Sequence, residues 1–193
     1  MTGKYHTGDR VAPHALLTAS GALVAVPDAA RVTHLQFRRF AGCPICNLHL
    51  RSFVQRIGEI EAAGIAEVVV FHSTPQEMRR YEDGLPFAVI GDPERRLYRE
   101  FGVEAGPRAL SDPRALLAIL RTIPLVTLDL LRTGTLSANL SPHGGRLGLP
   151  ADFLIAPDGR VMAAKYGAHA DDQWSVDEVL GLIPPNSSHH GRA

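Results

Sequence analysis

Alternation of short apolar runs with helical patterns constrains the fold of this chain more than any other feature. The run Val32–Phe37 is typical of a strand, and a helical pattern begins at Pro44. Proline suits the first helical position because its missing N–H would be unpaired there anyway. Two further short apolar runs, at 67–71 and 87–90, are each followed by a helical pattern. This order predicts an α/β fold with a central sheet that contains parallel strand pairs and is flanked by helices.

The flanking segments add strands to the same sheet-based unit. A β-hairpin is predicted over 11–26, with Gly21 in its turn, and a strand–turn–strand pattern spans 152–164. A stretch from about 106 to 148 interrupts this order, and its helical pattern covers 114–131. The chain length fits one domain. We predict a single domain over 1–183, with a helical insert at about 106–148 and a disordered tail at 184–193.

The two cysteines of the chain stand together at the start of the first predicted helix, as Cys43-Pro-Ile-Cys46. Two thiols at this spacing can close a small disulfide ring and reopen it. The helix N-terminus favours the thiolate form of Cys43, and the thiolate is the reactive species in exchange chemistry. Cys46 shares an apolar helix face with Leu50 and Phe53, which predicts that it is buried. We expect Cys43 at the exposed tip as the nucleophile and Cys46 as the sheltered resolving thiol.

Alternatives to a redox pair are a zinc site and two inert packing residues. A structural zinc site needs four ligands and usually a second cysteine pair, which this sequence does not contain. Arg38 and Arg39 precede the motif, and only one of two adjacent residues at a strand end can point toward it. Arg39 is our candidate substrate-binding residue, able to lower the pKa of Cys43 or bind an acidic partner. Solvation at the surface is the alternative for both arginines.

The charge balance excludes several classes of partner. Twenty Lys and Arg balance 20 Asp and Glu, so the net charge of zero predicts neither nucleic-acid nor anionic-membrane binding. Arg121, Pro124 and Asp129 interrupt the apolar stretch 116–131, which argues against a membrane span. The polar first ten residues and the paucity of cysteines predict a cytoplasmic protein.

Four segments of the sequence carry recognisable motifs. They are Gly8-Asp-Arg-Val-Ala-Pro13 through Gly21, Leu35-Gln-Phe-Arg-Arg-Phe-Ala-Gly-Cys-Pro-Ile-Cys46, Phe87 to Gly102, and Leu149-Pro-Ala-Asp-Phe-Leu-Ile-Ala-Pro-Asp-Gly-Arg-Val161. Together they cover most of 8–182, apart from 106–148. These segments resemble the peroxiredoxin-like branch (alkyl hydroperoxide reductase/thiol-specific antioxidant, or redoxin) of the thioredoxin-like superfamily.

The resemblance implies a thioredoxin-like fold in which Pro150 is a cis-proline that faces the cysteines and contributes to substrate binding. One departure bears on the substrate. Typical members carry Pro-x-x-x-Thr-x-x-Cys. This chain has Gln36 in place of the proline, seven residues before Cys43, and Phe40 in place of the threonine, three residues before it. In addition, Pro150 stands where a thiolate-contacting arginine is often found. Disulfide exchange is therefore the first expectation and hydroperoxide reduction the second.

The expected function is that of a thiol-dependent oxidoreductase with an antioxidant role. Its partners would be an external reductant, either thioredoxin-like or a low-molecular-weight thiol, and a peroxide or disulfide substrate. No cofactor or metal is required. The helical stretch 114–131 allows a homodimer contact or a cover over the cysteine cleft. The alternative is a non-catalytic thioredoxin-fold redox sensor or binding module that uses 106–148 as its partner surface.

Overall fold

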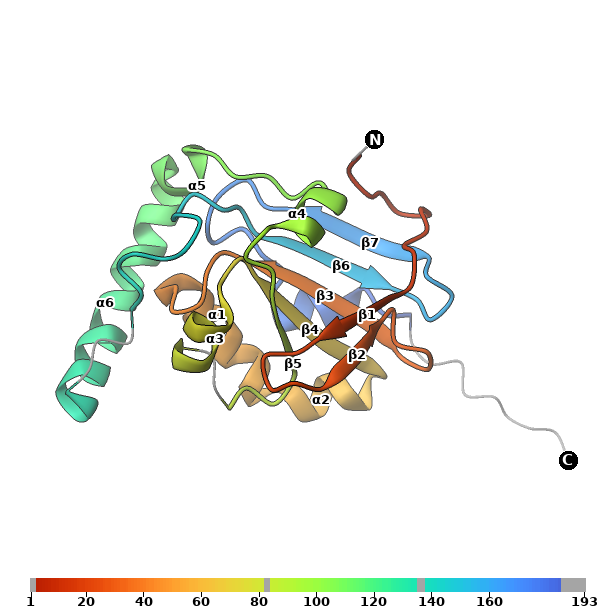
Figure 1. Cartoon of the computed structure of the whole chain (residues 1–193), viewed down its shortest axis with the longest axis horizontal. Coiled ribbons are helices and arrows are strands. Elements are labelled where there is room, and N and C mark those ends of the chain that lie inside the picture. Colours follow the sequence, from red (N-terminus) through yellow and green to blue (C-terminus); the bar gives the residue numbers. More distant parts are fainter. Residues whose placement is uncertain (1–2, 82–83, 135–137, 185–193) are drawn as a thin grey trace, which may run out of the picture.

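The computed structural model describes residues 3–81, 84–134 and 138–184. A five-stranded mixed sheet lies at its centre, with the strands in the order β5–β4–β3–β6–β7 (Figure 1). Strands β3, β4 and β5 are parallel, while β6 and β7 run antiparallel to their neighbours. Their bounds are β3 (Val32–Arg38), β4 (Ile65–Phe71), β5 (Ala88–Gly91), β6 (Ala151–Ile155) and β7 (Val161–Tyr166). The predicted α/β fold, with a central sheet that contains parallel strand pairs, is confirmed, and the sheet is mixed.

The predicted N-terminal hairpin is also confirmed, as an antiparallel pair of β1 (His14–Leu17) and β2 (Leu23–Val26). It lies in front of the sheet together with the short helix α4 (Arg96–Glu100), whereas α7 (Val176–Gly181) lies behind (Figure 1). Apolar side chains of β3 and β6 fill the space under the hairpin and α4. The helices thus flank the sheet on both faces.

Helix α1 (Pro44–Gln55) follows β3 and carries the cysteine motif at its start. The apolar periodicity predicts one helix through Ile60. The helix is instead interrupted at Arg56, where φ is −114° and ψ is 18°, and a second helix follows as α2 (Ile57–Ala62). The Arg56 side chain stands at this break and pairs with Glu59 and Asp177 at 2.7 and 2.6 Å. The remaining helices are α3 (Pro75–Tyr81), α5 (Arg108–Ser111) and α6 (Pro113–Thr133).

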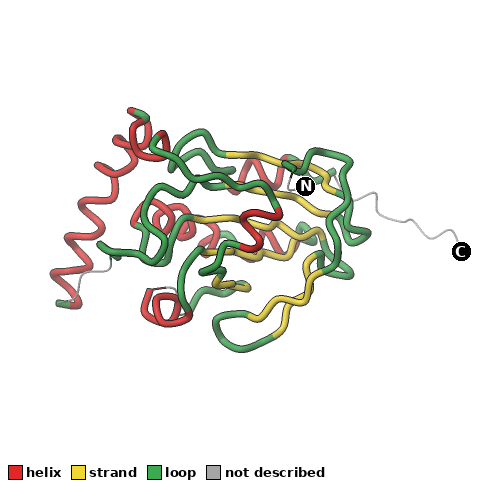
Figure 2. The backbone as a smooth tube through the Cα atoms, turned by 45° about the horizontal axis from the view of Figure 1, so that its top comes forward, coloured by secondary structure: helices red, strands yellow, loops and turns green. Residues whose placement is uncertain are grey.

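The region 106–148 leaves the sheet and returns to it through a short paired neck. The N–H of Gly106 donates to Leu147 at 2.8 Å, and that of Leu149 donates to Glu104 at 3.1 Å. Ala105 and Gly148 form an antiparallel bridge between these bonds. Beyond the neck lie α5 and α6, and Figure 2 shows α6 standing beside the sheet.

None of the described helices is long and apolar enough to cross a membrane. The predicted tail at 184–193 lies outside the described residues except for Pro184.

Candidate active site

Cys43 occupies the N-cap position of α1, at the end of the loop that leaves β3. Its backbone is extended, with φ −73° and ψ 117°, and Pro44 begins the helix as expected. The backbone N–H groups of Ile45 and Cys46 and the Cys46 thiol all act to lower the pKa of the Cys43 thiol. The first turn of the helix is therefore organised around one sulfur atom. Both thiols are free in this structure.

The surroundings of the two cysteines shift their pKa values in opposite directions. Burial raises the pKa of Cys43, but the hydrogen bond from Cys46, the charge of Arg39 and the helix N–H groups outweigh it and bring the pKa to about 7. Burial raises the pKa of Cys46, and the hydrogen bond to Cys43 and its charge raise it further. At pH 7, about half of Cys43 is thus thiolate while Cys46 keeps its proton.

The expectation that Cys43 is exposed is wrong, because both cysteines are about 1% exposed. Burial of Cys46 is confirmed by the same measurement. The covering residues come from distant parts of the sequence: Ala115 and Ala118 of α6 and Ala170 after β7 pack into the same apolar cluster as the thiols. Their small side chains let α6 approach α1 closely. Access to the thiolate therefore requires movement of this cover.

Of the two adjacent arginines, only Arg39 reaches the motif. Its Nη1 lies 3.6 Å from the Cys43 sulfur, and its Nη2 donates to the carbonyl of Arg146. The side chain is 3% exposed, so its charge acts on the sulfur with little screening by water. Arg38 points to the opposite side of the strand and is fully buried there.

Arg38 belongs to a buried charged network beneath α1 that the sequence reasoning missed. Its Nη2 donates to Asp152 at 2.7 Å and lies 3.1 Å from His49 on α1. His34 contacts the carboxylate of Glu67 at 2.9 Å and that of Asp152 at 3.3 Å. Burial alone would lower the pKa of His34, but the two carboxylates raise it to about 9. The network thus holds charges of both signs in a region from which water is excluded.

Pro150 lies at the same end of the sheet as the cysteine loop, because Ala151 pairs with Phe37 of β3. Among the described residues the cis peptide bond is Val26–Pro27, so the expected cis bond before Pro150 is wrong. The extended pairing in the neck leads directly into β6, and the chain makes no turn at this bond. Pro150 is buried and borders a cavity of about 160 Å³ whose other lining residues come from the N-terminus, the neck and the end of β7.

A second cover over the site is the segment 138–150, which we call the strap. Asn139 fastens one end: its N–H donates to Gly42 at 2.9 Å and its side-chain amide to Ala41 at 3.3 Å. The carboxylate of Glu77 on α3 accepts from the same amide at 3.0 Å and from the N–H of His143 at 2.9 Å. The strap is therefore held on the loop that carries Cys43.

Comparison with known proteins places these features in a family. A sequence profile described as AhpC/TSA antioxidant enzyme matches residues 52–169, which begin after both cysteines. No curated protein sequence matches the chain.

Among solved structures, peroxidoxin BcpB from Mycobacterium tuberculosis is 16% identical, with 92% of this chain and 96% of that chain covered and a TM-score of 0.63. A thiol:disulfide interchange protein DsbE from Chlorobium tepidum is 20% identical, with coverage of 92% and 98% and a TM-score of 0.57. Peroxiredoxin Q from Xanthomonas campestris is 17% identical, with 89% of each chain covered and a TM-score of 0.58.

These structural likenesses show that the chain has a thioredoxin-like fold of the kind found in peroxiredoxins. The profile match spans more than half of the 193 residues. The chain therefore belongs to the AhpC/TSA antioxidant enzyme family.

Proposed function

We propose that the protein is a thiol–disulfide oxidoreductase in which Cys43 is the nucleophile and Cys46 the resolving thiol. The observation that carries this proposal is the opposite shift of the two pKa values, which prepares one thiolate and one thiol in contact with each other. A nucleophile with a pKa near the ambient pH combines a high thiolate fraction with high intrinsic reactivity.

In the first step the Cys43 thiolate attacks one sulfur of a substrate disulfide. A mixed disulfide forms, and the other substrate sulfur leaves as a thiolate that takes up a proton. Cys46 then loses its proton and attacks the Cys43 sulfur, which releases the second substrate thiol and closes the Cys43–Cys46 disulfide. Two electrons have passed to the substrate, and an external thiol reductant returns the pair to its reduced form. We propose a thioredoxin-like protein or a low-molecular-weight thiol as this reductant.

Hydroperoxide reduction is the second reaction that the same pair can perform. The Cys43 thiolate would attack the terminal peroxide oxygen, giving a sulfenic acid and releasing an alcohol or water. The thiol of Cys46 would then condense with the sulfenic acid, releasing water and forming the same disulfide. Phe40 stands where peroxiredoxins typically carry threonine, and its ring is buried in the apolar cluster. We therefore place disulfide exchange before peroxide reduction.

Arg39 and Pro150 are the proposed substrate-binding residues. The guanidinium of Arg39 is positioned to stabilise negative charge on the attacking and leaving sulfurs, because it already lies 3.6 Å from Cys43. Pro150 is proposed to border the substrate on the β6 side of the loop. A reducing cytoplasm is the compartment that we propose, since it regenerates reactive thiols. A homodimer through the outward side of α6 stays a prediction.

Stopped-flow oxidation of the reduced protein tests the reaction class. The protein is mixed with hydrogen peroxide in one series and with a protein disulfide in the other, and the two second-order rate constants are compared. We expect the disulfide to react faster and Cys43→Ser to abolish both reactions. A faster peroxide reaction would reverse our order of substrates.

The burial of both thiols favours one alternative, a redox-sensing or binding module whose cover rearranges on oxidation. Turnover separates the two functions. An enzyme consumes many equivalents of substrate when a reducing system is supplied, whereas a sensor stops after one.

A further inference from the structure

Two guanidinium groups lie without a carboxylate partner, that of Arg39 beside Cys43 and that of Arg95 beside His72. Arg39 donates to the Cys43 sulfur and to the carbonyl of Arg146, and Arg95 donates to the carbonyl of Gly144 at 2.5 Å and approaches His72 at 3.5 Å. Within the described residues, none of these contacts of Arg39 or Arg95 is to an Asp or Glu. In the described part of the chain, the acceptors that face the two guanidinium groups are the Cys43 sulfur, the His72 ring and two carbonyl oxygens of the strap.

His72 links the two arginines into one electropositive cluster. Its Nδ1 faces Arg95, and its backbone N–H donates to the carbonyl of Arg39 at 3.3 Å. Burial lowers the pKa of His72, and the charges of Arg95 and Arg39 lower it further, to about 4. The imidazole is therefore neutral at pH 7, in part because two cations lie beside it.

Two buried polar atoms in this cluster have no hydrogen-bond partner, Nε of Arg39 and Nε2 of His72. Their side chains are 3% and 1% exposed. A buried N–H without an acceptor is costly, so the closed arrangement leaves binding capacity unused at this place. An anionic group has several acceptor lone pairs and supplies what the carbonyls of the strap do not.

Glycine at two positions lets the strap lie close to the cluster. A Cβ on Gly144 would lie 3.0 Å from Nη2 of Arg95 and 3.3 Å from Nδ1 of His72, and φ there is +72°. A Cβ on Gly148 would lie 3.1 Å from Nε2 of His72. The strap therefore lies directly on the polar atoms that a ligand would contact.

We propose that Arg39, His72 and Arg95 form a subsite for an anionic group, a carboxylate or phosphate on the disulfide or hydroperoxide substrate, which displaces the strap carbonyls as it binds. This proposal rests on the proposed function and deepens it by naming the substrate class. The strap is then an internal substitute for the anion. Binding of the anion would thus release the strap from Arg39 and Arg95, next to the reactive thiol.

The test compares two aromatic disulfides of similar shape, dithiobis(nitrobenzoate), which carries carboxylates, and dithiodipyridine, which is neutral. Each is reacted with the reduced Cys46→Ser protein, so that only formation of the mixed disulfide at Cys43 is followed. For each protein we take the rate constant with the anionic reagent divided by the rate constant with the neutral reagent. This ratio for the folded protein is then divided by the same ratio for the protein unfolded in urea, which gives a corrected ratio. Changes in the pKa of Cys43 or in strap opening act on both reagents and largely cancel in this ratio.

We expect the folded protein to favour the anionic reagent by about tenfold, the size of one charge-assisted hydrogen bond. Arg95→Gln should reduce this preference severalfold and Arg95→Lys should restore part of it. Arg99→Gln is the matched control, because it removes an exposed positive charge from the same helix.

A corrected ratio near one, with dithiodipyridine still reacting at Cys43, would overturn the anion subsite and leave the thiol–disulfide function standing. A high ratio that Arg95→Gln leaves unchanged would overturn the assignment to Arg95 and hence the subsite as defined. If the folded protein reacts with neither reagent, the role of Cys43 as nucleophile is wrong, and the subsite proposal fails with it.

Discussion

Replacing Arg39 by glutamine should raise the pKa of Cys43 by about one unit, which corresponds to roughly 1.4 kcal/mol. The pKa of about 7 lies below the ordinary value of 9.0, although burial of the thiol acts to raise it. The Cys46 hydrogen bond, the Arg39 charge and the helix N–H groups share the opposing effect, so loss of one of them returns part of the difference. At pH 7 the thiolate fraction would fall from about one half to about one tenth, and the reaction rate by about fivefold.

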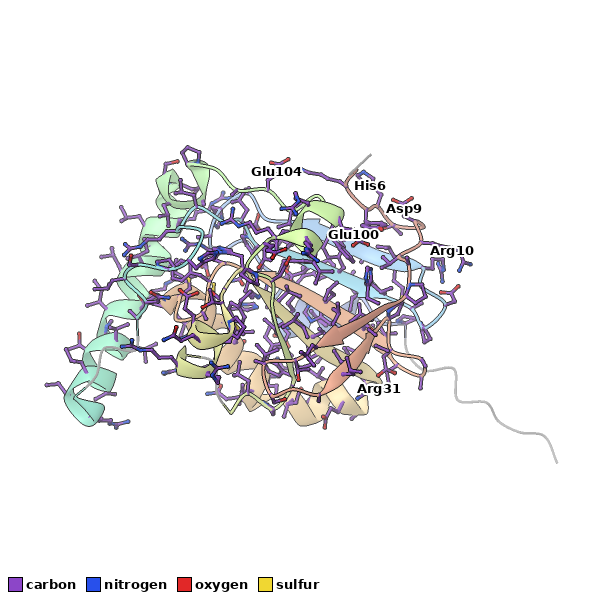
Figure 3. The ribbon with its side chains drawn as sticks, in the orientation of Figure 1. His6, Asp9, Arg10, Arg31, Glu100 and Glu104 are labelled. Carbon is purple, nitrogen blue, oxygen red and sulfur yellow. The ribbon has the colours of Figure 1, made fainter. Side chains whose placement is uncertain are left out.

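The assay is the rate of alkylation of Cys43 by iodoacetamide as a function of pH, in a Cys46→Ser background so that one thiol is followed. The neutral reagent reports the thiolate fraction without an anion effect. Arg39→Lys should give an intermediate pKa. Arg10→Gln is the control, because this arginine is exposed and lies at the opposite end of the molecule from α1, as Figures 1 and 3 show. An unchanged midpoint in Arg39→Gln, or a rate loss that is equal at every pH, would refute the electrostatic role.

Three further outcomes follow from the site and its surroundings. Cys46→Ser should let Cys43 form a mixed disulfide with substrate that persists, and mass spectrometry of the quenched reaction would show the adduct; rapid release of the substrate would contradict the resolving role. Glu77→Ala removes the acceptor of two strap hydrogen bonds and should accelerate alkylation of Cys43 by iodoacetamide severalfold, whereas an unchanged rate would mean that the strap does not limit access. His34 has a pKa of about 9 in the folded protein against an ordinary value of 6.5, so its stabilising contribution is complete below pH 6.5 and is lost as the pH rises through 9. The free energy of unfolding should therefore decrease by up to about 3 kcal/mol over this interval in urea titrations, and His34→Asn should flatten that dependence.

The sequence predicts those parts of the fold and site that depend on neighbouring residues. The apolar run that forms β3 and the proline that begins α1 are local signals, and both elements start where these signals place them. Burial of Cys46 follows from its spacing to Leu50 and Phe53 on one helix face. The same local logic gives Cys43 its place at the helix start and its lowered pKa.

Burial of Cys43 could not be predicted in the same way. Its cover includes Ala115 and Ala118, which lie far along the chain in a helix whose packing partner has no local signature. Burial of the polar residues of β3 could not be predicted from local sequence either. Alternating polar residues in a strand usually indicate a solvent-exposed face, but here Glu67 and Asp152 on the neighbouring strands compensate the charges of His34 and Arg38. Only the register of the sheet reveals that these four residues meet.

The neck between 104–106 and 147–149 also has a consequence for how this protein can diverge. Because the two ends of the insert are bonded to each other before the chain enters β6, the length of the segment between them does not affect the strand register. Insertions and deletions within α5 and α6 can therefore accumulate while the central sheet stays intact. What such changes alter is the cover over Cys43, so evolution can retune access to an unchanged reactive thiol by lengthening or shortening a single excursion of the chain.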